Sequence, residues 1–493
     1  MGFPCLLLGL VAATGVCSAF RVMSGRELIQ PIRFRGAWLV IRILAGQTDR
    51  VFMKNGPYRL RRLVSGAIFM LSLTVACAED PSGSSSPRSP IVFLPGFGMG
   101  TLHVRVDSSA GGPAEFAFLL PPLNPAGDGT AKSPSPLLYA LNNGLATEDI
   151  DDVPGWLELV TEEDGSVRSL TGVTVEALST GVDFLAECPR YRGWMEKVEG
   201  EGWTRDQNLY CAPYDYRFPP GETNDSVRLM ALIEKASEES GGVPVSLMCH
   251  SQGCLIAYHF LRTMPEPWLE KNVGLFFSFA GQFSGCSDCI RWAFQKRWDW
   301  DSEDALASDS DPTWAGENAL GLESEMYQNR EIFRVGLTPY SASTIPDLLS
   351  FAGAVDTEKA LGRYALAQQT WYQKGSQLGE ALRVPARFVY GSEIPTTVGY
   401  SFEAAQPSPP GCGEPSCGPL YSQDYPGLIQ MEGDGGMNGI MTRAPSRWTA
   451  DPTCEMRAMP GIQHMDIFDN EAAIRMATEL AGEVLSGDLS CLQ

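Results

Sequence analysis

The chain has 493 residues, with 37 Lys and Arg against 59 Asp and Glu, a net charge of −22, 13 Cys and four His. At 44% hydrophobic and 19% charged residues, its composition is that of a globular protein and not of a disordered one. A chain this acidic lacks the basic face that displaces counterions from nucleic acid, so we expect no nucleic-acid partner. Scarce histidine leaves little room for metal chemistry, and we expect no metal and no other cofactor.

The charge is divided unevenly along the chain. Residues 1–78 contain ten basic and two acidic residues, a net charge of +8, whereas the rest carries −30. Within this basic segment, Arg59, Arg61 and Arg62 precede the apolar run 63–75 and the small residues Ala76-Cys77-Ala78. This order is typical of a secretory signal peptide, so we interpret 1–78 as a targeting leader with a signal core at 59–78.

Two alternatives to a cleaved secretory signal stay open. The segment 63–78 is short for a span of about 20 residues but is a candidate membrane anchor. An earlier apolar run, 5–20, followed by the Arg-rich stretch 21–62, would instead resemble a multipartite plastid leader. Met53, just upstream of the signal, is a candidate true start. The main expectation is an extracellular or endomembrane-lumenal protein.

Ten cysteines follow residue 78, and an oxidising compartment favours disulfides. Cys412 and Cys417 are near enough in sequence to pair with each other or with Cys454. Cys286 and Cys289 form one Cys-x-x-Cys pair without a second pair or a nearby His, which does not complete a zinc site. Asn224 begins a glycosylation sequon.

Strand and helix patterns alternate after a Ser- and Pro-rich linker at 79–90. This alternation predicts an α/β fold with a mostly parallel sheet covered on both faces. Residues 106–170 are rich in Gly, Pro and Ser and read as a loop-rich excursion, and 286–345 is an acidic, Trp-rich insertion suited either to a membrane-contacting lid or to the core of a cap. The predicted strands are 91–94, 244–249, 274–280 and 387–390, and the predicted helices are 182–201, 225–240 and 470–485.

Ser251 lies between a buried strand and the helix that follows it. A serine at such a sharp turn presents its hydroxyl outward, and the helix N-terminus stabilises nearby negative charge. The segment Cys249-His-Ser251-Gln-Gly253 differs from the usual Gly-x-Ser-x-Gly because Cys249 replaces the first glycine. The alternative is a serine that caps an ordinary helix.

An acid and a histidine follow the serine in the chain order of α/β hydrolases. His464 stands in a loop before the last helix, whereas His259 lies on the helix after Ser251 and is badly placed to reach back to it. Asp434 is flanked by glycines that would let its carboxylate approach the imidazole of His464. Asp424 and Asp466 remain alternatives for the acid, and a simple turn aspartate is the alternative role for Asp434.

These motifs together resemble the family of lecithin:cholesterol acyltransferases, lysosomal phospholipase A/ceramide acyltransferases and phospholipid:diacylglycerol acyltransferases. The resemblance covers roughly residues 90–485 and rests on the segments 90–97, 212–217 (Ala-Pro-Tyr-Asp-Tyr-Arg), 250–253, 433–435 and 461–464. It implies an α/β-hydrolase core with cap, lid and membrane-binding insertions: a first core part at 91–285, a cap or lid at 286–380 and a second core part at 381–493.

The resemblance also implies roles for individual residues. Ser251 would be the nucleophile, Asp434 the orienting acid and His464 the base, and the backbone amides of Phe97 and Gln252 would bind the oxyanion. The expected reaction transfers a fatty acyl chain from a glycerophospholipid at a membrane or lipoprotein-like surface to a sterol, diacylglycerol, ceramide or water. Cys249, Gly436-Met437 and Gln282-Phe283 depart from the family pattern. A carboxylesterase or lipase for another ester class and an inactive lipid-binding homologue remain alternatives.

Overall fold

The computed structural model divides into two units, Met1–Ser86 and Pro87–Gln493, which are described separately. In the first unit, the described residues form an antiparallel sheet of β1 (Ile29–Phe34), β2 (Ala37–Arg42) and β3 (Thr74–Ala76). The rest of the predicted leader lies outside the described residues, so its signal and anchor alternatives stay predictions. Described residues of the second unit are 88–107, 116–120, 152–162, 166–178, 181, 183–285, 287–291, 293–294, 322–353, 357–372, 382–403, 420, 427–449 and 454–485.

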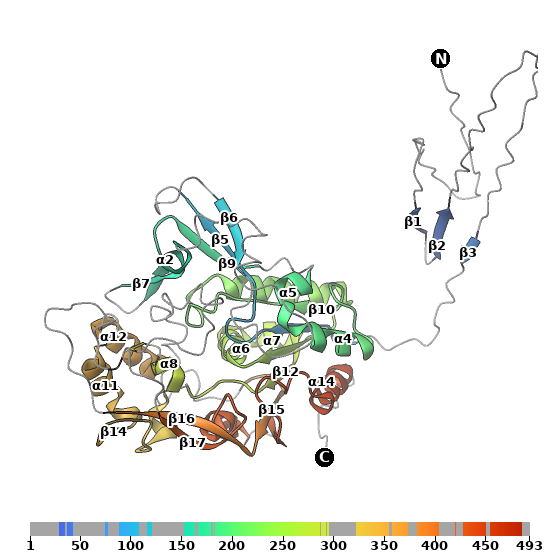
Figure 1. Ribbon diagram of the computed structural model, residues 1–493. Helices are drawn as coiled ribbons and strands as arrows, with labels where there is room; N and C mark the ends of the chain where they lie inside the picture. The colour runs from blue at the N-terminus through green and yellow to red at the C-terminus, as the bar shows by residue number, and fades with distance from the viewer. Residues whose placement is uncertain are drawn as a thin grey trace, which may run out of the picture. The chain divides into compact units, whose positions relative to one another are not determined.

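A parallel sheet of six strands forms the centre of the second unit (Figure 1). In spatial order the strands are β10 (Leu209–Cys211), β4 (Ile91–Leu94), β11 (Val245–His250), β12 (Val273–Phe279), β15 (Ala386–Ser392) and β18 (Cys454–Pro460). The predicted strands are confirmed, and β10 and β18 complete the sheet. Because all the strands run the same way, their carboxyl ends meet at one edge, where α/β folds bind ligands.

Helices cover both faces of this sheet, which explains why its strands are continuous apolar runs. On β4, Val92 and Leu94 join the hydrophobic cluster of one face, while Ile91 and Phe93 join that of the other. The first face packs against α5 (Asp225–Glu239), α6 (Gln252–Thr263) and α7 (Glu266–Asn272), and the second against α3 (Phe184–Glu187), α4 (Arg192–Gly200) and α14 (Glu471–Glu483). Among the described residues, no helix has the length and apolar character needed to cross a membrane.

The predicted helix at 182–201 is interrupted. Cys188 separates α3 from a short 3₁₀ turn, η3 (Pro189–Tyr191), which leads into α4. Proline has no backbone N–H to donate, and Cys188 is tied to Cys211 of β10 by a disulfide, so one continuous helix cannot form. The predicted helices at 225–240 and 470–485 are confirmed as α5 and α14.

A second, antiparallel sheet includes one strand from the predicted loop-rich excursion at 106–170 and two strands that flank it. Its strands are β6 (Phe116–Leu120), β5 (Leu102–Val106) and β9 (Val173–Ala177), beside α2 (Val153–Leu157) and the hairpin of β7 (Leu159–Thr161) and β8 (Val167–Ser169). Elements of three to five residues are too short to show a clear hydrophobic period, which is why the sequence pattern missed them.

A four-stranded sheet, which we call the cap sheet, has the order β14 (Thr338–Tyr340), β13 (Phe333–Val335), β16 (Ile394–Phe402), β17 (Gly427–Gly433). Its strands β13 and β14 lie in the segment 286–380, predicted as a cap or lid, and β16 and β17 lie after it, while the domain boundaries stay predictions. Shorter elements of the segment 286–380 are α8 (Ser287–Arg291), α10 (Ser324–Tyr327), η5 (Ala342–Thr344), α11 (Ile345–Ala352), α12 (Thr357–Ala367) and the π-helical turn η6 (Gln368–Tyr372). The tryptophans that suggested a lid, from 292 to 314, lie outside the described residues.

A buried ion pair lies within the loop after β10, and its arginine also bonds to the helix α2. The side chains of Arg217 and Asp215 are 0% and 2% exposed, and the guanidinium donates to both carboxylate oxygens, from Nε to Oδ1 at 2.9 Å and from Nη2 to Oδ2 at 2.7 Å. Nη1 also donates to the carbonyl of Leu157, at 3.1 Å. A two-pronged contact of this kind is among the strong charge-assisted hydrogen bonds. The Ala-Pro-Tyr-Asp-Tyr-Arg segment therefore links two parts of the unit.

Replacing Asp215→Asn is expected to lower the free energy of unfolding by about 3–5 kcal/mol, because it leaves a buried guanidinium without its counter-charge. Urea unfolding followed by circular dichroism measures the change. The control is Glu176→Gln, which removes the exposed pair of Arg105 and Glu176 and should cost at most about 1 kcal/mol. Equal losses in the two variants would contradict a special role for the buried pair.

Candidate active site

Ser251 occupies the sharp turn between β11 and α6. Its backbone has φ 52° and ψ −127°, a conformation that a residue with a side chain adopts only under strain. The turn is tied to the neighbouring strand β12, because the N–H of Ser251 donates to the carbonyl of Phe279 and its carbonyl accepts from the N–H of Gln282, both at 3.1 Å. The serine is 8% exposed. The predicted strand–serine–helix arrangement is present.

The loop after β4 packs directly against this turn. A Cβ added at Gly253 would lie 2.2 Å from the carbonyl oxygen of Pro95, and one added at Gly96 would lie 3.2 Å from the Cβ of Ser251. Gly253 therefore needs to be glycine, since the backbone of Pro95 cannot move away as a flexible side chain can, whereas an added Cβ at Gly96 would make a tight contact with side-chain atoms only. The close contact puts the segment around Phe97 beside the serine.

His464 and Asp434 reach Ser251 through two hydrogen bonds. The Nε2 of His464 lies 3.1 Å from the Oγ of Ser251, and its Nδ1 lies 3.0 Å from the Oδ2 of Asp434. The imidazole is 13% exposed and the carboxylate 0%. The structure thus brings together the three side chains that the sequence singled out, in the order hydroxyl, imidazole and carboxylate.

Asp434 is held by the backbone around it. It follows β17, and its Oδ1 accepts from the N–H groups of Gly436 and Met437, which leaves Oδ2 for the imidazole. A Cβ added at Gly436 would lie 2.8 Å from the Cβ of His464, so glycine is required where acid loop and histidine loop meet. After the acid the chain forms α13 (Gly439–Thr442) and the 3₁₀ turn η9 (Ala444–Trp448) before it enters β18.

The alternatives for the acid and the base lie elsewhere. Asp466 is two residues beyond His464 and its N–H bonds to the carbonyl of Gln463, while Asp424 lies outside the described residues. His259 is buried on α6, where desolvation lowers its pKa to about 4. His103 lies on β5, in the second sheet.

The two predicted oxyanion residues flank the serine. Gln252 is the first residue of α6, and its side chain accepts a hydrogen bond from the hydroxyl of Tyr214 at 3.1 Å. Phe97 follows Gly96 in the loop packed on the turn, and its ring contacts that of Tyr216. The roles of both backbone amides stay predictions.

A second disulfide bridges the two ends of the turn. Cys249, in place of the usual glycine, is bonded to Cys254 in the first turn of α6, so the bridge encloses Ser251. Sequence spacing could not assign this pair, although two cysteines flanking the serine are a signal. Cys289 is also disulfide-bonded, whereas Cys412 and Cys417 lie outside the described residues, so their pairing with each other or with Cys454 stays a prediction. In the described part of the chain, no group of three His, Cys, Asp or Glu could hold a metal ion.

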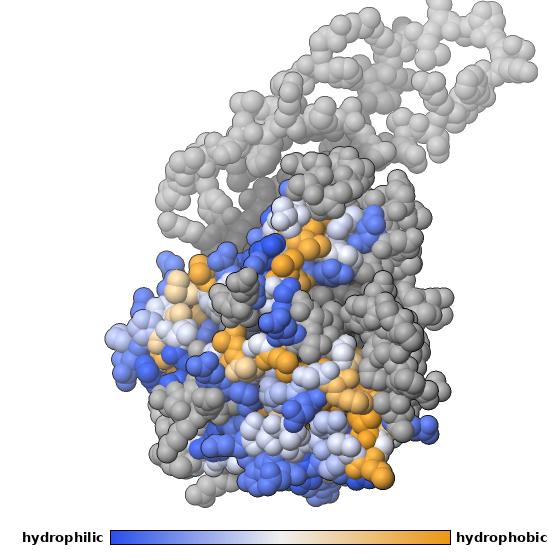
Figure 2. Space-filling view, turned by 90° about the vertical axis from the view of Figure 1, so that its left-hand side faces the viewer, coloured by the Kyte–Doolittle hydropathy of each residue, from blue (hydrophilic) through white to orange (hydrophobic). Residues whose placement is uncertain are grey.

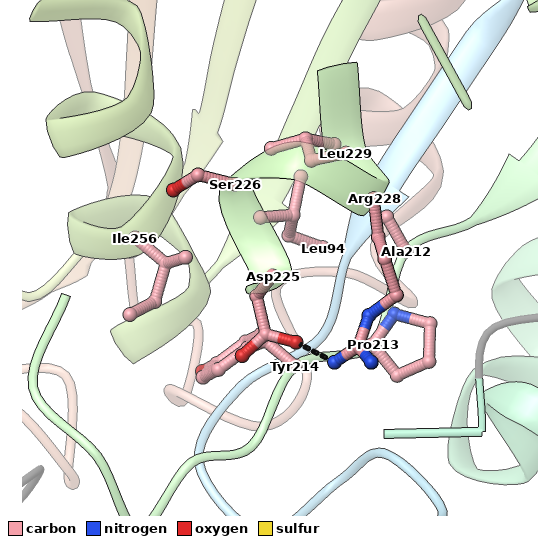
Figure 3. A pocket seen from close by; sticks show the side chains of 9 residues that line it. All are labelled: Leu94, Ala212, Pro213, Tyr214, Asp225, Ser226, Arg228, Leu229 and Ile256. Carbon is pink, nitrogen blue, oxygen red and sulfur yellow. Dashed lines mark hydrogen bonds and ion pairs between the residues drawn. The ribbon is translucent and has the colours of Figure 1, made fainter. Parts of the chain in front are cut away.

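A small recess lies next to this centre (Figure 3). Its lining comes from four segments: Leu94 of β4, the segment 212–214, the start of α5 and Ile256 of α6. Asp225 and Arg228 form an ion pair at its wall, and burial raises the pKa of Asp225, a shift that the guanidinium opposes. None of the three central residues belongs to its lining, but Tyr214 connects the recess to Gln252.

Two residues near the serine were not identified from the sequence. His250 and Tyr191 are 0% exposed and contact each other beside His464. Tyr191 lies 60 residues before the serine. His250 directly precedes it, and this adjacency is the one signal that was available.

The fold and the site together define a class of protein. A parallel sheet that carries a serine at a strand–helix turn, followed along the chain by an acid and a late histidine, is an α/β-hydrolase fold. A chain in the crystal structure of the Tle4–Tli4 complex shares this fold with a TM-score of 0.51 and 12% identity, covering 82% of this chain and 99% of that one.

Within this class, residues 156–295 match the family model of lecithin:cholesterol acyltransferase, which confirms the resemblance seen in the motifs. The chain is 23% identical to lecithin-cholesterol acyltransferase-like 1 of Oryza sativa subsp. japonica, over 87% of this chain and 93% of that protein. It is 26% identical to the human lysosomal phospholipase A and acyltransferase, over 48% of this chain and 56% of that protein. It is 27% identical to human phosphatidylcholine-sterol acyltransferase over 24% of this chain and 29% of that protein.

Replacing Gly253→Ala is expected to slow covalent labelling of Ser251 by a fluorophosphonate by roughly 100-fold, the effect of a misplacement of about 1 Å. The added methyl group would push the turn away from Pro95. Gly482→Ala is the control, because a Cβ there meets nothing within 4 Å. It should leave labelling unchanged and raise the free energy of unfolding by about 0.5–1 kcal/mol. Normal labelling of the Gly253 variant would contradict the required close contact.

Removing either disulfide should lower the free energy of unfolding, but only one of the two removals should change the reactivity of Ser251. Removing the Cys188–Cys211 bridge with two alanines should lower the free energy of unfolding by about 3 kcal/mol, and removing the Cys249–Cys254 bridge by about 2 kcal/mol, since the shorter loop restricts the unfolded chain less. The loss of the second bridge alone should slow fluorophosphonate labelling, because it frees the turn that holds Ser251. Equal labelling rates in both variants would count against this assignment.

Proposed function

We propose that this protein is a serine-dependent lipid acyltransferase or phospholipase that uses an acyl-serine intermediate. The observation that carries the proposal is the chain of two hydrogen bonds from Ser251 through His464 to Asp434. The general class, an O-acyltransferase or phospholipase, follows from the match to the lecithin:cholesterol acyltransferase family. The finer features, namely the triad roles, the acceptor and the compartment, are part of the proposal.

In the first half of the proposed reaction, Nε2 of His464 takes the proton of Ser251 as Oγ attacks the ester carbonyl of a glycerophospholipid. Asp434 keeps the imidazole in the required tautomer and stabilises its protonated form. The amides of Phe97 and Gln252 bind the oxyanion of the tetrahedral intermediate. When this intermediate collapses, the lysophospholipid oxygen takes the proton from His464 and leaves.

In the second half, an alcohol or water attacks the acyl-serine. His464 accepts the proton of the attacking hydroxyl and returns it to Oγ as the ester or fatty acid departs. Sterol, diacylglycerol, ceramide and water are the acceptors proposed. The choice among them depends on whether the closed site excludes water while admitting a lipid alcohol.

Exposed apolar side chains support a substrate held in a lipid surface. Leu337, in the turn between β13 and β14, is 100% exposed, and Phe351 of α11 is 43% exposed. Figure 2 shows hydrophobic surface lying between hydrophilic residues on one face of the molecule. Contiguous exposed apolar surface is suited to contact with a membrane or a lipoprotein-like particle.

An oxidising compartment, lumenal or extracellular, is part of the proposal. Its support is the two disulfides of the described core. Asn224 of the sequon is exposed at the start of α5, where a glycan would be accommodated. The basic leader of residues 1–78 is the proposed targeting signal, with membrane anchoring by 63–78 or a plastid route as the alternatives.

Phosphatidylcholine vesicles with and without sterol, diacylglycerol or ceramide test both the activity and the acceptor. The purified protein is expected to release fatty acid or to form a new acyl ester, and Ser251→Ala is expected to lose at least about 10⁴-fold, since no other group supplies the nucleophile. Gly482→Ala serves as an active control. Full activity of the Ser251 variant would overturn the proposal.

Two other outcomes would point to the alternatives. Activity on soluble short-chain esters without activity on vesicles would favour a carboxylesterase. Failure of a fluorophosphonate to label Ser251 in folded, lipid-bound protein would favour an inactive lipid-binding homologue.

A further inference from the structure

His250 and Tyr191 form a buried polar pair next to the candidate triad. Both are 0% exposed, and Nδ1 of His250 lies 2.9 Å from the hydroxyl of Tyr191. Around them are the rings of His464, Phe468 and Phe93, with centroids 4.6–5.0 Å from one or the other. A polar pair surrounded by aromatic rings in this way must satisfy its hydrogen bonds within the protein.

The hydrogen bonds of His250 define its tautomer. Its Nε2 lies 3.1 Å from the backbone carbonyl of His464, which can only accept, so Nε2 carries the proton. Nδ1 is then the acceptor for the hydroxyl of Tyr191. Met99 Sδ is also within 2.9 Å of that hydroxyl, but a thioether is a much weaker acceptor than an imidazole nitrogen.

Burial keeps this imidazole neutral. Desolvation holds the pKa of His250 well below its usual value, and the nearby His464 lowers it further, although the bond to the His464 carbonyl acts in the opposite direction. Burial also raises the pKa of the Tyr191 hydroxyl. Neither group changes its charge near neutral pH, so the pair is suited to holding positions and not to moving protons.

The pair connects two loops that lie on either side of Ser251. At one end, the hydroxyl of Tyr191 accepts from the N–H of Gly96, at 2.8 Å, in the loop that carries Phe97. At the other end, His250 holds the carbonyl of His464, whose own N–H donates to the carbonyl of Asp434 at 2.7 Å. The backbone of His464 is therefore held from both sides.

We propose that His250 and Tyr191 are positioning residues that hold the loop of Phe97 and the loop of His464 in register around Ser251 through one continuous chain of neutral hydrogen bonds. The inference rests on the proposed function, since it assigns a role around the same serine. Without the pair, the side chains of Ser251, His464 and Asp434 would all still be present, but they would shift relative to one another. A displacement of this kind lowers reactivity more than it lowers substrate binding.

The test compares Tyr191→Phe, His250→Gln, His250→Leu and the Tyr191→Phe/His250→Gln double variant. Tyr191→Phe keeps the ring and removes only the hydroxyl, while the amide nitrogen of Gln can replace Nε2 as the donor to His464. We expect Tyr191→Phe to lower kcat roughly 10-fold to 100-fold with KM nearly unchanged. His250→Leu should lose more than His250→Gln, and the double variant should lose less than the product of its two single losses, because the two groups act as one unit.

Each variant has a matched control outside the pair. Tyr364→Phe removes another buried tyrosine hydroxyl, which bonds to the carbonyl of Ala342 at 2.7 Å in the cap. His259→Gln replaces another buried histidine, on α6. Both controls should keep the wild-type rate of fluorophosphonate labelling, whereas the test variants should label slowly at wild-type concentrations of folded protein.

Labelling also separates this inference from the proposed function. If the wild-type protein labels at Ser251 but does not act on vesicles, the proposed lipid function fails while the pair is still tested by labelling rates. Wild-type rates in Tyr191→Phe and His250→Gln, or losses that multiply independently in the double variant, would overturn the inference. If Tyr191→Phe does not fold, the ratio between His250→Gln and His250→Leu decides, and equal rates for these two would overturn it. Absence of labelling in the wild-type protein would overturn both.

Discussion

The strained backbone of Ser251 is the constraint on which the rest of the site depends. A residue with a side chain at φ 52° is stable only when its surroundings hold it, and here the ladder to β12, the close approach of Pro95 to Gly253 and the Cys249–Cys254 bridge all act on the same few residues. The cysteine in place of the usual glycine is therefore not a weakened version of the turn. It adds a covalent connection across the turn that holds Ser251.

Two of the three segments that meet at this turn come together because parallel strands end at one edge of the sheet. Ser251 follows β11 and His464 follows β18, two strands of the same sheet, with β12 and β15 between them. The imidazole of His464 can lie against the loop of Asp434 because Gly436 has no side chain at the point where that loop meets the loop after β18. The geometry of the sheet thus brings the hydroxyl of Ser251 and the imidazole of His464 from different strands, and they meet above the ends of the strands between them.

Local sequence patterns predict the elements whose structure depends mainly on residues close together in the chain. The strands at 91–94 and 244–249, the serine turn and the last helix follow from runs of apolar residues and their flanking caps. The meeting of Ser251, Asp434 and His464 could be predicted from chain order and flanking glycines. The two disulfides, the cap sheet and the contact of Tyr191 with His250 could not, because each joins segments whose proximity exists only after the chain has folded.

Asp434 comes from a different sheet than Ser251 and His464, and this limits which parts of the protein can move without separating them. Asp434 directly follows β17, an edge strand of the cap sheet, whereas His464 and Ser251 follow strands of the central sheet. The carboxylate that contacts His464 thus comes from the cap sheet, whereas Ser251 comes from the central sheet. A hinge motion of the cap sheet as one rigid piece would pull the carboxylate away from the imidazole. For the lipid substrate proposed above, entry through movement of segments other than this sheet would leave the hydrogen-bond chain intact.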